Sequence, residues 1–317
     1  MSLSERLHRA AADLGPRARI DEPLGPLTTY RVGGCAAIFV APATRTELDE
    51  AAAVIARHEL PLLVVGRGSN LLVADRGFDG VAMSLSALAD GIEINGVEVY
   101  SGSAVALPVL ARKTAAAGLT GFEWAVGVPG SIGGAVRMNA GGHGSDIAAC
   151  LVQAEIFDVT ELKCRWRPAS TLGLRFRGSG LNDHEIVLTA HLQLAAGDIE
   201  RSEHEIAEIV RWRRENQPGG QNAGSVFVNP IPGELSAGEL IDRVGLRGFR
   251  IGGAFVSDKH ANFIQAGEGA TAADVKAVIE AVRERVARET GFELRSEVRL
   301  VGFTEIAAGR SEGGRHG

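Results

Sequence analysis

The chain has 317 residues, of which 45% are hydrophobic and 23% charged, and its net charge is −6. This near-average composition excludes wholesale disorder, and the negative charge argues against a protein that binds polyanions. At about 100–200 residues per domain, the length predicts two or three domains. The 41 glycines stand beside only 5% aromatic residues, so they need an explanation in backbone terms, such as tight turns or close approach to a ligand.

Neither a membrane span nor a secretion signal is expected. The longest uncharged stretch, residues 216–233, is rich in Gly, Asn and Pro rather than apolar. Residues 1–13 have the pattern of a charged amphipathic helix without the apolar core of a signal peptide. The three cysteines, Cys35, Cys150 and Cys164, lack the spacing of zinc ligands, so we expect reduced thiols, no metal site and a cytoplasmic protein.

The first ninety residues alternate strand and helix patterns. Residues 37–40 predict a short strand, and residues 46–58 predict a helix with Thr46 as its cap. The apolar strand expected at 60–65 runs directly into Gly-Arg-Gly-Ser-Asn at 66–70, the first glycine segment. Extended chain follows it, and a further strand is expected near 81–85.

Beyond residue 90 the pattern changes to hairpins. Residues 92–100 alternate apolar and polar around Asn95-Gly96, a pair that favours a tight type I′ turn. A helix is expected at 107–117, and strands at 151–158, 163–167 and 186–194. Between them lies the second glycine segment, residues 127–134.

The last third predicts three helices and a closing strand. The helix at 202–215 ends before Pro218, and we place a domain boundary near its start. Helices follow at 236–244 and at 271–290, the second capped by Thr271 and ended by Gly291. A strand is expected at 297–301, and the tail at 307–317 has the composition of a disordered segment.

The two glycine segments are the first candidates for ligand binding. The first lacks the third glycine and the following helix of a Rossmann fingerprint, and the chain has no Walker lysine beside it. Consecutive small residues can still offer backbone N–H groups to an anion, with Arg67 adding charge, although a plain tight turn explains the same residues. In the second segment Pro129-Gly130 favours a turn and Gly133-Gly134 leaves bare backbone. Together the two segments favour a phosphate-bearing cofactor held between two lobes.

For several polar residues the sequence allows either a structural role or a functional one. Ser225 follows a glycine without the Gly-x-Ser-x-Gly elbow of a hydrolase. Arg211 and Arg214 share a helix face, which fits either a solvated surface or a diphosphate clamp. The others are Arg177, His260 and Glu297.

Seven segments, in this order, resemble the UDP-N-acetylenolpyruvoylglucosamine reductase family. They are TTYRVGG at 28–34, GRGSNLL at 66–72, GVPGSIGGA at 127–135, AGSVFVNP at 223–230, GAFVS at 253–257, HANF at 260–263 and EVRLVG at 297–302. Any single segment is weak, but the ordered set is specific.

The resemblance implies an α+β fold: the two-subdomain FAD-binding fold of the vanillyl-alcohol-oxidase class, at 1–90 and 91–200, plus a C-terminal α+β substrate domain at 201–304. It implies that NADPH reduces FAD, and that the enolpyruvyl group of UDP-N-acetylglucosamine enolpyruvate is then reduced to give UDP-N-acetylmuramate, a precursor of peptidoglycan. It implies no nucleic-acid, membrane or oligomeric partner.

The resemblance also implies roles for particular residues. Ser225 would protonate C2 of the substrate, Arg177 would bind its carboxylate, and a protonated Glu297 would orient the enolic system. The implied FAD-binding residues are Arg31, Gly66, Arg67, Gly68, Ser69, Asn70, Leu71, Gly127, Val128, Pro129, Gly130, Ser131, Gly133 and Gly134. The implied UDP-sugar contacts are Arg211, Arg214, Asn229 and His260.

Three positions depart from the family pattern. Phe176 and His143 stand where the family often has Tyr, Val228 stands where Lys is frequent, and no insertion carries a substrate-covering tyrosine loop, which indicates the shorter subtype.

Two other functions are alternatives. An FAD-dependent carbohydrate or alcohol oxidase would often carry a flavin-linking histidine near the first glycine segment, but residues 59–90 contain none. A non-catalytic nucleotide-binding module would be expected to lack part of the catalytic set.

Overall fold

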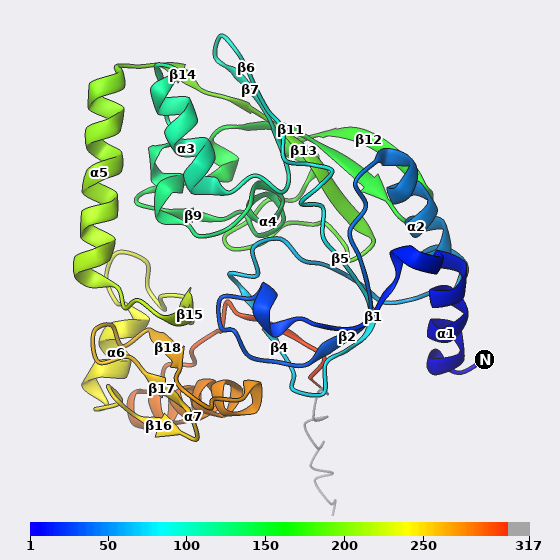
Figure 1. Ribbon diagram of the computed structural model, residues 1–317. Coiled ribbons are helices and arrows are strands. Elements are labelled where there is room, and N and C mark those ends of the chain that lie inside the picture. The colour runs from blue at the N-terminus through cyan, green and yellow to red at the C-terminus, as the bar shows by residue number, and fades with distance from the viewer. Residues whose placement is uncertain (304–317) are drawn as a thin grey trace, which may run out of the picture.

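The N-terminal part of the chain forms a four-stranded sheet, here called the first sheet, in a computed structural model that describes residues 1–303 (Figure 1). Its strands, in spatial order, are β1 (Arg19–Pro23), β2 (Cys35–Val40), β5 (Phe78–Met83) and β3 (Leu62–Val64). Helices α1 (Leu3–Leu14) and α2 (Arg45–Arg57) bury their apolar sides against one face of it. The cap predicted for α2 is wrong: the Thr44 hydroxyl, not that of Thr46, accepts the N–H of Glu47. The tail predicted at 307–317 lies outside the described residues.

An antiparallel five-stranded sheet, the second sheet, follows. Its strands, in spatial order, are β12 (Lys163–Pro168), β11 (Leu151–Asp158), β13 (Glu185–Gln193), β7 (Glu98–Gly102) and β6 (Ile92–Asn95). The predicted hairpin is confirmed, because Asn95 pairs with Glu98. The predicted type I′ turn at Asn95-Gly96 is wrong: the two turn residues are Gly96 and Val97, and only Gly96 has a positive φ, 62°, which is the pattern of a type II′ turn. Helix α3 (Leu107–Ala116) was also predicted, but α4 (Ile132–Met138), which begins within the second glycine segment, was not. Four two-residue strands complete this part: β8 (Leu119–Thr120), β9 (Gly141–Gly142), β10 (Ser145–Asp146) and β14 (Ala195–Ala196).

Helix α5 (Ile199–Asn216) leads from the second sheet to the third (Figure 1). It starts three residues before the predicted position because Asp198 caps it. The third sheet has the order β15 (Gln221–Ser225), β18 (Phe263–Ala266), β17 (Ala254–Val256) and β16 (Arg250–Ile251). It packs with α6 (Ala237–Arg243) and α7 (Ala272–Thr290), and the caps predicted for α7 are confirmed at Thr271 and Gly291.

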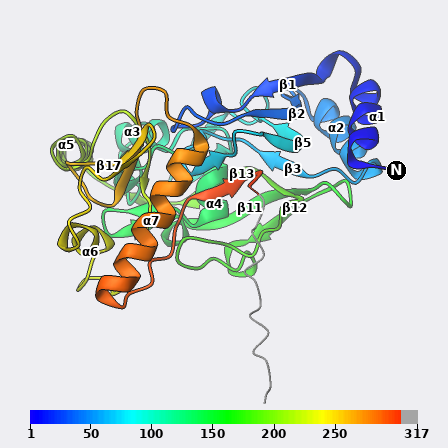
Figure 2. The same cartoon turned by 90° about the horizontal axis from the view of Figure 1, so that it is seen from below.

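The C-terminal end of the described residues contacts the N-terminal part of the chain. Strand β19 (Arg299–Val301) pairs in parallel with β4 (Leu71–Val73), the strand that follows the first glycine segment. The Asp75 carboxylate accepts the N–H groups of Ala272 and Ala273 at 2.8 and 2.9 Å, at the start of α7. Helix α7 packs against the third sheet, and in the view of Figure 2 the red C-terminal strand runs between the strands of the first sheet and those of the second. The third sheet and its helices are therefore fastened to the N-terminal part of the chain.

The predicted domain limits, 1–90, 91–200 and 201–304, stay a prediction, although each interval contains one of the three larger sheets. Among the helices within residues 1–303, none combines the length and the apolar character that a membrane crossing requires.

Candidate active site

The two glycine segments meet at one cavity. Gly66 and Arg67 line it together with Ser131, Gly133 and Gly134, in a space of about 230 Å³ between the first and second sheets. The cavity depends on missing side chains. A Cβ at Gly66 would lie 2.5 Å from the Ser131 hydroxyl oxygen, and a Cβ at Gly133 would lie 2.8 Å from the Cβ of Ser103. These glycines therefore let the two segments pack closely beside the cavity.

The first glycine segment presents a row of peptide donors. Within residues 1–303, none of the N–H groups of residues 66–70 donates to a protein acceptor. Gly68, with a φ of 59°, gives the segment its turn, and its carbonyl accepts the N–H of Thr29 at 3.2 Å. Successive peptide N–H groups in a turn form a concavity that binds anions. A phosphate group would supply the acceptors that these donors lack.

Charged residues that the sequence did not indicate also line the cavity. Arg137 and Arg299 each donate to the same carboxylate oxygen of Asp183, at 2.5 and 2.7 Å, and Arg67 adds a third guanidinium. Burial, and then the nearby Arg299, lower the pKa of Arg137. Arg299 lies two residues after Glu297, and strand alternation could have placed the two on one face. Arg137 and Asp183 have no such signal.

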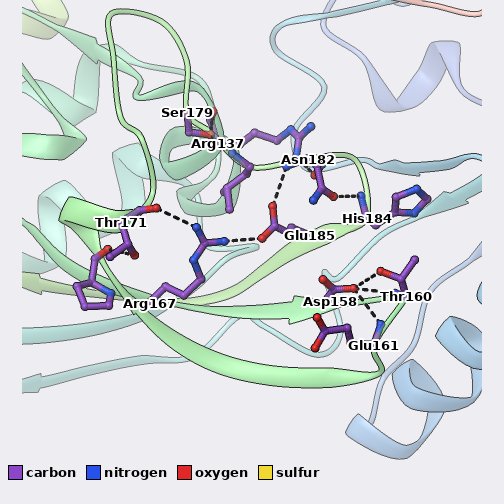
Figure 3. Close-up of polar contacts among 12 residues, drawn as sticks. Arg137, Asp158, Thr160, Glu161, Arg167, Thr171, Ser179, Asn182, His184 and Glu185 are labelled. Atoms are coloured by element: carbon purple, nitrogen blue, oxygen red, sulfur yellow. Dashed lines mark hydrogen bonds and ion pairs between the residues drawn. The ribbon is translucent and has the colours of Figure 1, made fainter.

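A tight turn holds Arg177. Arg175 and Gly178 exchange backbone hydrogen bonds of 2.9 and 3.0 Å around it, and Arg177 itself has a φ of 55°, uncommon for a residue with a side chain. The turn is fastened to α4: the Ser179 hydroxyl donates to the carbonyl of Arg137 at 2.7 Å, at the edge of the network in Figure 3. The position of Arg177 therefore depends on contacts that no local sequence pattern describes.

Two of the three predicted catalytic residues are in direct contact, and the third is close by along the backbone. The Arg177 Nε donates to a carboxylate oxygen of Glu297 at 3.0 Å. The N–H of Glu297 donates to the carbonyl of Val226 at 2.8 Å, and Val226 directly follows Ser225. Burial raises the pKa of the Glu297 carboxyl, and Arg177 opposes that rise. Ser225 is exposed.

The remaining predicted FAD residues lie at different distances from the cavity. The two glycine segments adjoin, since a Cβ at Gly130 would be 3.6 Å from the Ser69 hydroxyl oxygen. Gly127 instead makes room for the ring of His143, 2.7 Å from where its Cβ would be. The Arg31 guanidinium donates to the carbonyl of a proline in its own loop at 2.7 Å, and it is not among the residues that line the cavity.

The residues expected to contact a UDP-sugar make local contacts. Arg211 pairs with a glutamate on α5 at 3.4 Å, and the carbonyl of Arg214 accepts a bond from the Lys259 ammonium at 2.6 Å. The Asn229 side chain accepts the first N–H of α6 at 3.1 Å. Burial and a nearby arginine lower the pKa of His260. Their roles toward substrate stay a prediction.

Two departures from the family pattern lie near these residues. The Phe176 ring is exposed, and the Arg177 guanidinium lies 5.1 Å from its centre. His143 meets Trp212 of α5 edge-to-face, with ring centres 5.4 Å apart, and burial followed by Arg213 lowers its pKa. His143 therefore lies between the second glycine segment and α5.

Comparison with known proteins matches both parts of this architecture. A family model described as an FAD binding domain matches residues 36–161, and one described as the UDP-N-acetylenolpyruvoylglucosamine reductase C-terminal domain matches residues 216–301. The UDP-N-acetylenolpyruvoylglucosamine reductase of Heliobacterium modesticaldum is 42% identical, over 92% of each chain. That of Gloeobacter violaceus is 43% identical, over 88% of this chain and 94% of its own.

A solved structure matches as well. The crystal structure of the Thermus caldophilus reductase has a TM-score of 0.78 and 34% identity, and covers 90% of this chain and 99% of its own. An FAD-binding domain joined to this C-terminal domain places the chain among the FAD-dependent oxidoreductases and confirms the predicted α+β fold class. It belongs to the UDP-N-acetylenolpyruvoylglucosamine reductase family. The relatives' shared name favours this reading over the oxidase alternative.

The cavity suits the cofactor of this family. A diphosphate accepts hydrogen bonds and carries negative charge, and the cavity offers it three glycines, a row of N–H groups without protein acceptors and three arginines. FAD, with NADPH as the reductant, is the expected cofactor of this chain, in agreement with the sequence-based prediction.

Proposed function

We propose that this protein reduces the enolpyruvyl group of UDP-N-acetylglucosamine enolpyruvate with NADPH, giving UDP-N-acetylmuramate for peptidoglycan synthesis. The observation that carries the proposal is the Arg177–Glu297 pair, with Ser225 one residue from the backbone partner of Glu297. These groups, drawn from distant parts of the chain, are the ones needed to bind a carboxylate, stabilise an enolate and deliver a proton.

The chain's own groups would hold the cofactor at the cavity. Peptide N–H groups of residues 66–70 and the guanidinium of Arg67 would bind the diphosphate, and Gly133 and Gly134 would let it approach the backbone. When bound, FAD supplies hydride transfer, accepting hydride from NADPH and donating it at C3 of the enolpyruvyl group.

Arg177 would bind the enolpyruvyl carboxylate with its planar guanidinium. Some of its donors would then turn from Glu297 to the substrate. Burial raises the pKa of Glu297, and the positive charge of Arg177 is the largest effect that lowers it. When Arg177 binds the substrate carboxylate, this lowering effect would weaken and the pKa of Glu297 would rise further. Glu297 would then be protonated more readily, and in its neutral form it would donate a hydrogen bond to the developing enolate.

Ser225 would supply the proton that completes the product. Hydride arriving at C3 leaves an electron pair at C2, and the Ser225 hydroxyl gives its proton to that carbon. The serine then regains a proton from solvent, which its exposure allows. A hydroxyl is a weak acid, but a carbanion is a strong base, so the transfer requires position more than acidity.

The partners that we propose are small molecules: NADPH and the enolpyruvyl UDP-sugar. We propose neither a nucleic-acid nor a membrane partner, since the net charge is −6 and no helix within residues 1–303 could cross a bilayer. No oligomeric partner is proposed. We place the reaction in the cytoplasm, where both substrates are expected.

The decisive test is an anaerobic absorption experiment on the purified protein. We expect a flavin spectrum that NADPH bleaches and that the enolpyruvyl UDP-sugar restores. UDP-N-acetylglucosamine, which has no enolpyruvyl group, is the matched control and should restore nothing. Equal recovery with both sugars, or none with either, would contradict the proposed function.

A further inference from the structure

The side chain of Asn70 joins the first glycine segment to the backbone of Glu297, the residue proposed to donate a hydrogen bond to the enolate. Its amide Nδ2 donates to the carbonyl of Glu297 at 2.9 Å, across 227 residues of sequence. The carbonyl of Asn70 also accepts the N–H of Arg299 at 2.9 Å. The two bonds reach the peptide groups on either side of Val298, so Asn70 holds the backbone just after Glu297 on two points.

The backbone of Glu297 has both of its polar groups occupied. Its N–H donates to Val226, beside Ser225, and its carbonyl accepts from Asn70. The first bond links Glu297 to the residue after Ser225, the proposed proton donor, and the second links it to Asn70 in the first glycine segment, called the cofactor segment below. The carboxyl then reaches Arg177 at 3.0 Å. Asn70 itself does not line the cavity, whereas Gly66 and Arg67 of the same segment do.

We propose that Asn70 is a positioning residue for Glu297, which makes the placement of the Glu297 carboxyl depend on the conformation of the cofactor segment. The inference rests on the proposed function, in which Glu297 acts on the enolpyruvyl group. When a diphosphate orders the N–H groups of residues 66–70, the amide of Asn70 is fixed and Glu297 is fixed with it. Displacing a reacting group by about 1 Å can cost on the order of 100-fold in rate, so a single such bond matters.

The substitution Asn70→Ala isolates this contact. It removes the amide donor, but the carbonyl of residue 70 remains and can still accept the N–H of Arg299, so the pairing of β4 with β19 is retained. Asn216→Ala is the matched control. It removes an amide that also donates to a backbone carbonyl, that of Trp212 at 2.8 Å, on helix α5.

The experiment is a double-mutant cycle on Asn70→Ala and Glu297→Ala, because alanine removes the side-chain group that Asn70 is proposed to position. The measured rate is that at which the enolpyruvyl UDP-sugar reoxidises the NADPH-reduced protein. We expect Asn70→Ala to slow this step by about 10- to 100-fold in the parental background and by less than about twofold in the Glu297→Ala background, since the two residues act as one unit. Asn70→Gln, which keeps an amide donor, should recover part of the rate, and Asn216→Ala should change nothing.

Two further measurements separate positioning from cofactor binding and from folding. The dissociation constant of FAD, followed by flavin fluorescence, and the melting temperature of the apoprotein should stay close to the parental values in Asn70→Ala. The alkaline limb of the rate against pH, which we assign to Glu297, should shift in Asn70→Ala and not in Asn216→Ala.

Each adverse outcome has its own meaning. A parental rate in Asn70→Ala, an undiminished cost of that change in the Glu297→Ala background, or FAD affinity that falls in step with the rate would overturn the positioning role of Asn70. A parental rate in Glu297→Ala alone would instead overturn the proposed function of Glu297, on which the inference rests.

Discussion

Replacing Ser225 with alanine tests the proposed proton transfer most directly. The change deletes one oxygen from an exposed side chain that makes no hydrogen bond within residues 1–303. Exposed substitutions of this kind alter the free energy of unfolding by no more than about 0.5 kcal/mol. Any large effect on turnover would therefore come from chemistry and not from loss of the fold.

The expected change in activation free energy is far larger than this change in the free energy of unfolding. A positioned general acid contributes about 10²–10⁴ in rate, which corresponds to about 2.7–5.4 kcal/mol of activation free energy at 1.36 kcal/mol per decade. Ser225→Cys should recover part of the rate, because a thiol can also donate a proton.

Stopped-flow absorption separates the two halves of the reaction. We expect Ser225→Ala to bind FAD, to be reduced by NADPH at a near-parental rate and to fail when the enolpyruvyl UDP-sugar is added. A variant that turns over at the parental rate would refute this reasoning, and Glu297 or an ordered water would become the proton donor. Equal slowing of both halves would mean that Ser225 supports the flavin site instead.

Three other expected outcomes follow from the site. Gly134→Val should fold but purify colourless, because outside the backbone of its own helix the nearest atom to its Cβ would be Ser131 Oγ at 3.6 Å, and Gly134 lines the cavity that the side chain would enter. Full FAD occupancy would contradict the placement, with circular dichroism as the folding control. Arg177→Lys keeps the charge but loses the guanidinium fork, so the substrate half-reaction should slow by about tenfold or more while reduction by NADPH does not; an equal fall in both would make Arg177 structural. Burial raises the pKa of Glu297. In the proposed mechanism its neutral form is active, so turnover should be full below that pKa and fall as pH rises through it. Glu297→Gln should abolish this alkaline limb in a pH–rate profile, and a limb unchanged in that variant would belong to another group.

Local patterns predicted the elements whose signals lie within them. The strand expected at 151–158 coincides with β11, and α7 runs between the cap residues expected from Thr271 and Gly291. The hairpin at 92–100 is another such case, since Gly96 supplies the positive φ that its two-residue turn requires. In each, residues within a few positions of one another determine the structure.

What the sequence did not indicate depends on distant partners. Helix α4 has seven residues and includes two glycines, so its helix propensity is poor. It forms because Ile132 and Val136 are buried in the core beside the second sheet. The catalytic residues were suggested by resemblance, but their contact was not: Arg177 reaches Glu297 from a turn that Ser179 fastens to α4. The Arg137–Asp183–Arg299 contacts likewise join three separate segments, and spacing along the chain carries no trace of them.

The pairing of β4 with β19 has a consequence for synthesis on the ribosome. The bond from Asn70 to Glu297 spans 227 residues, and at about 5–20 residues per second the second partner emerges roughly 10–45 s after the first. Until then the chain leading out of the first glycine segment has no strand beside it among the described residues. A nascent chain stalled before residue 299 should therefore fail to capture FAD, even with the residues that line most of the cavity already made.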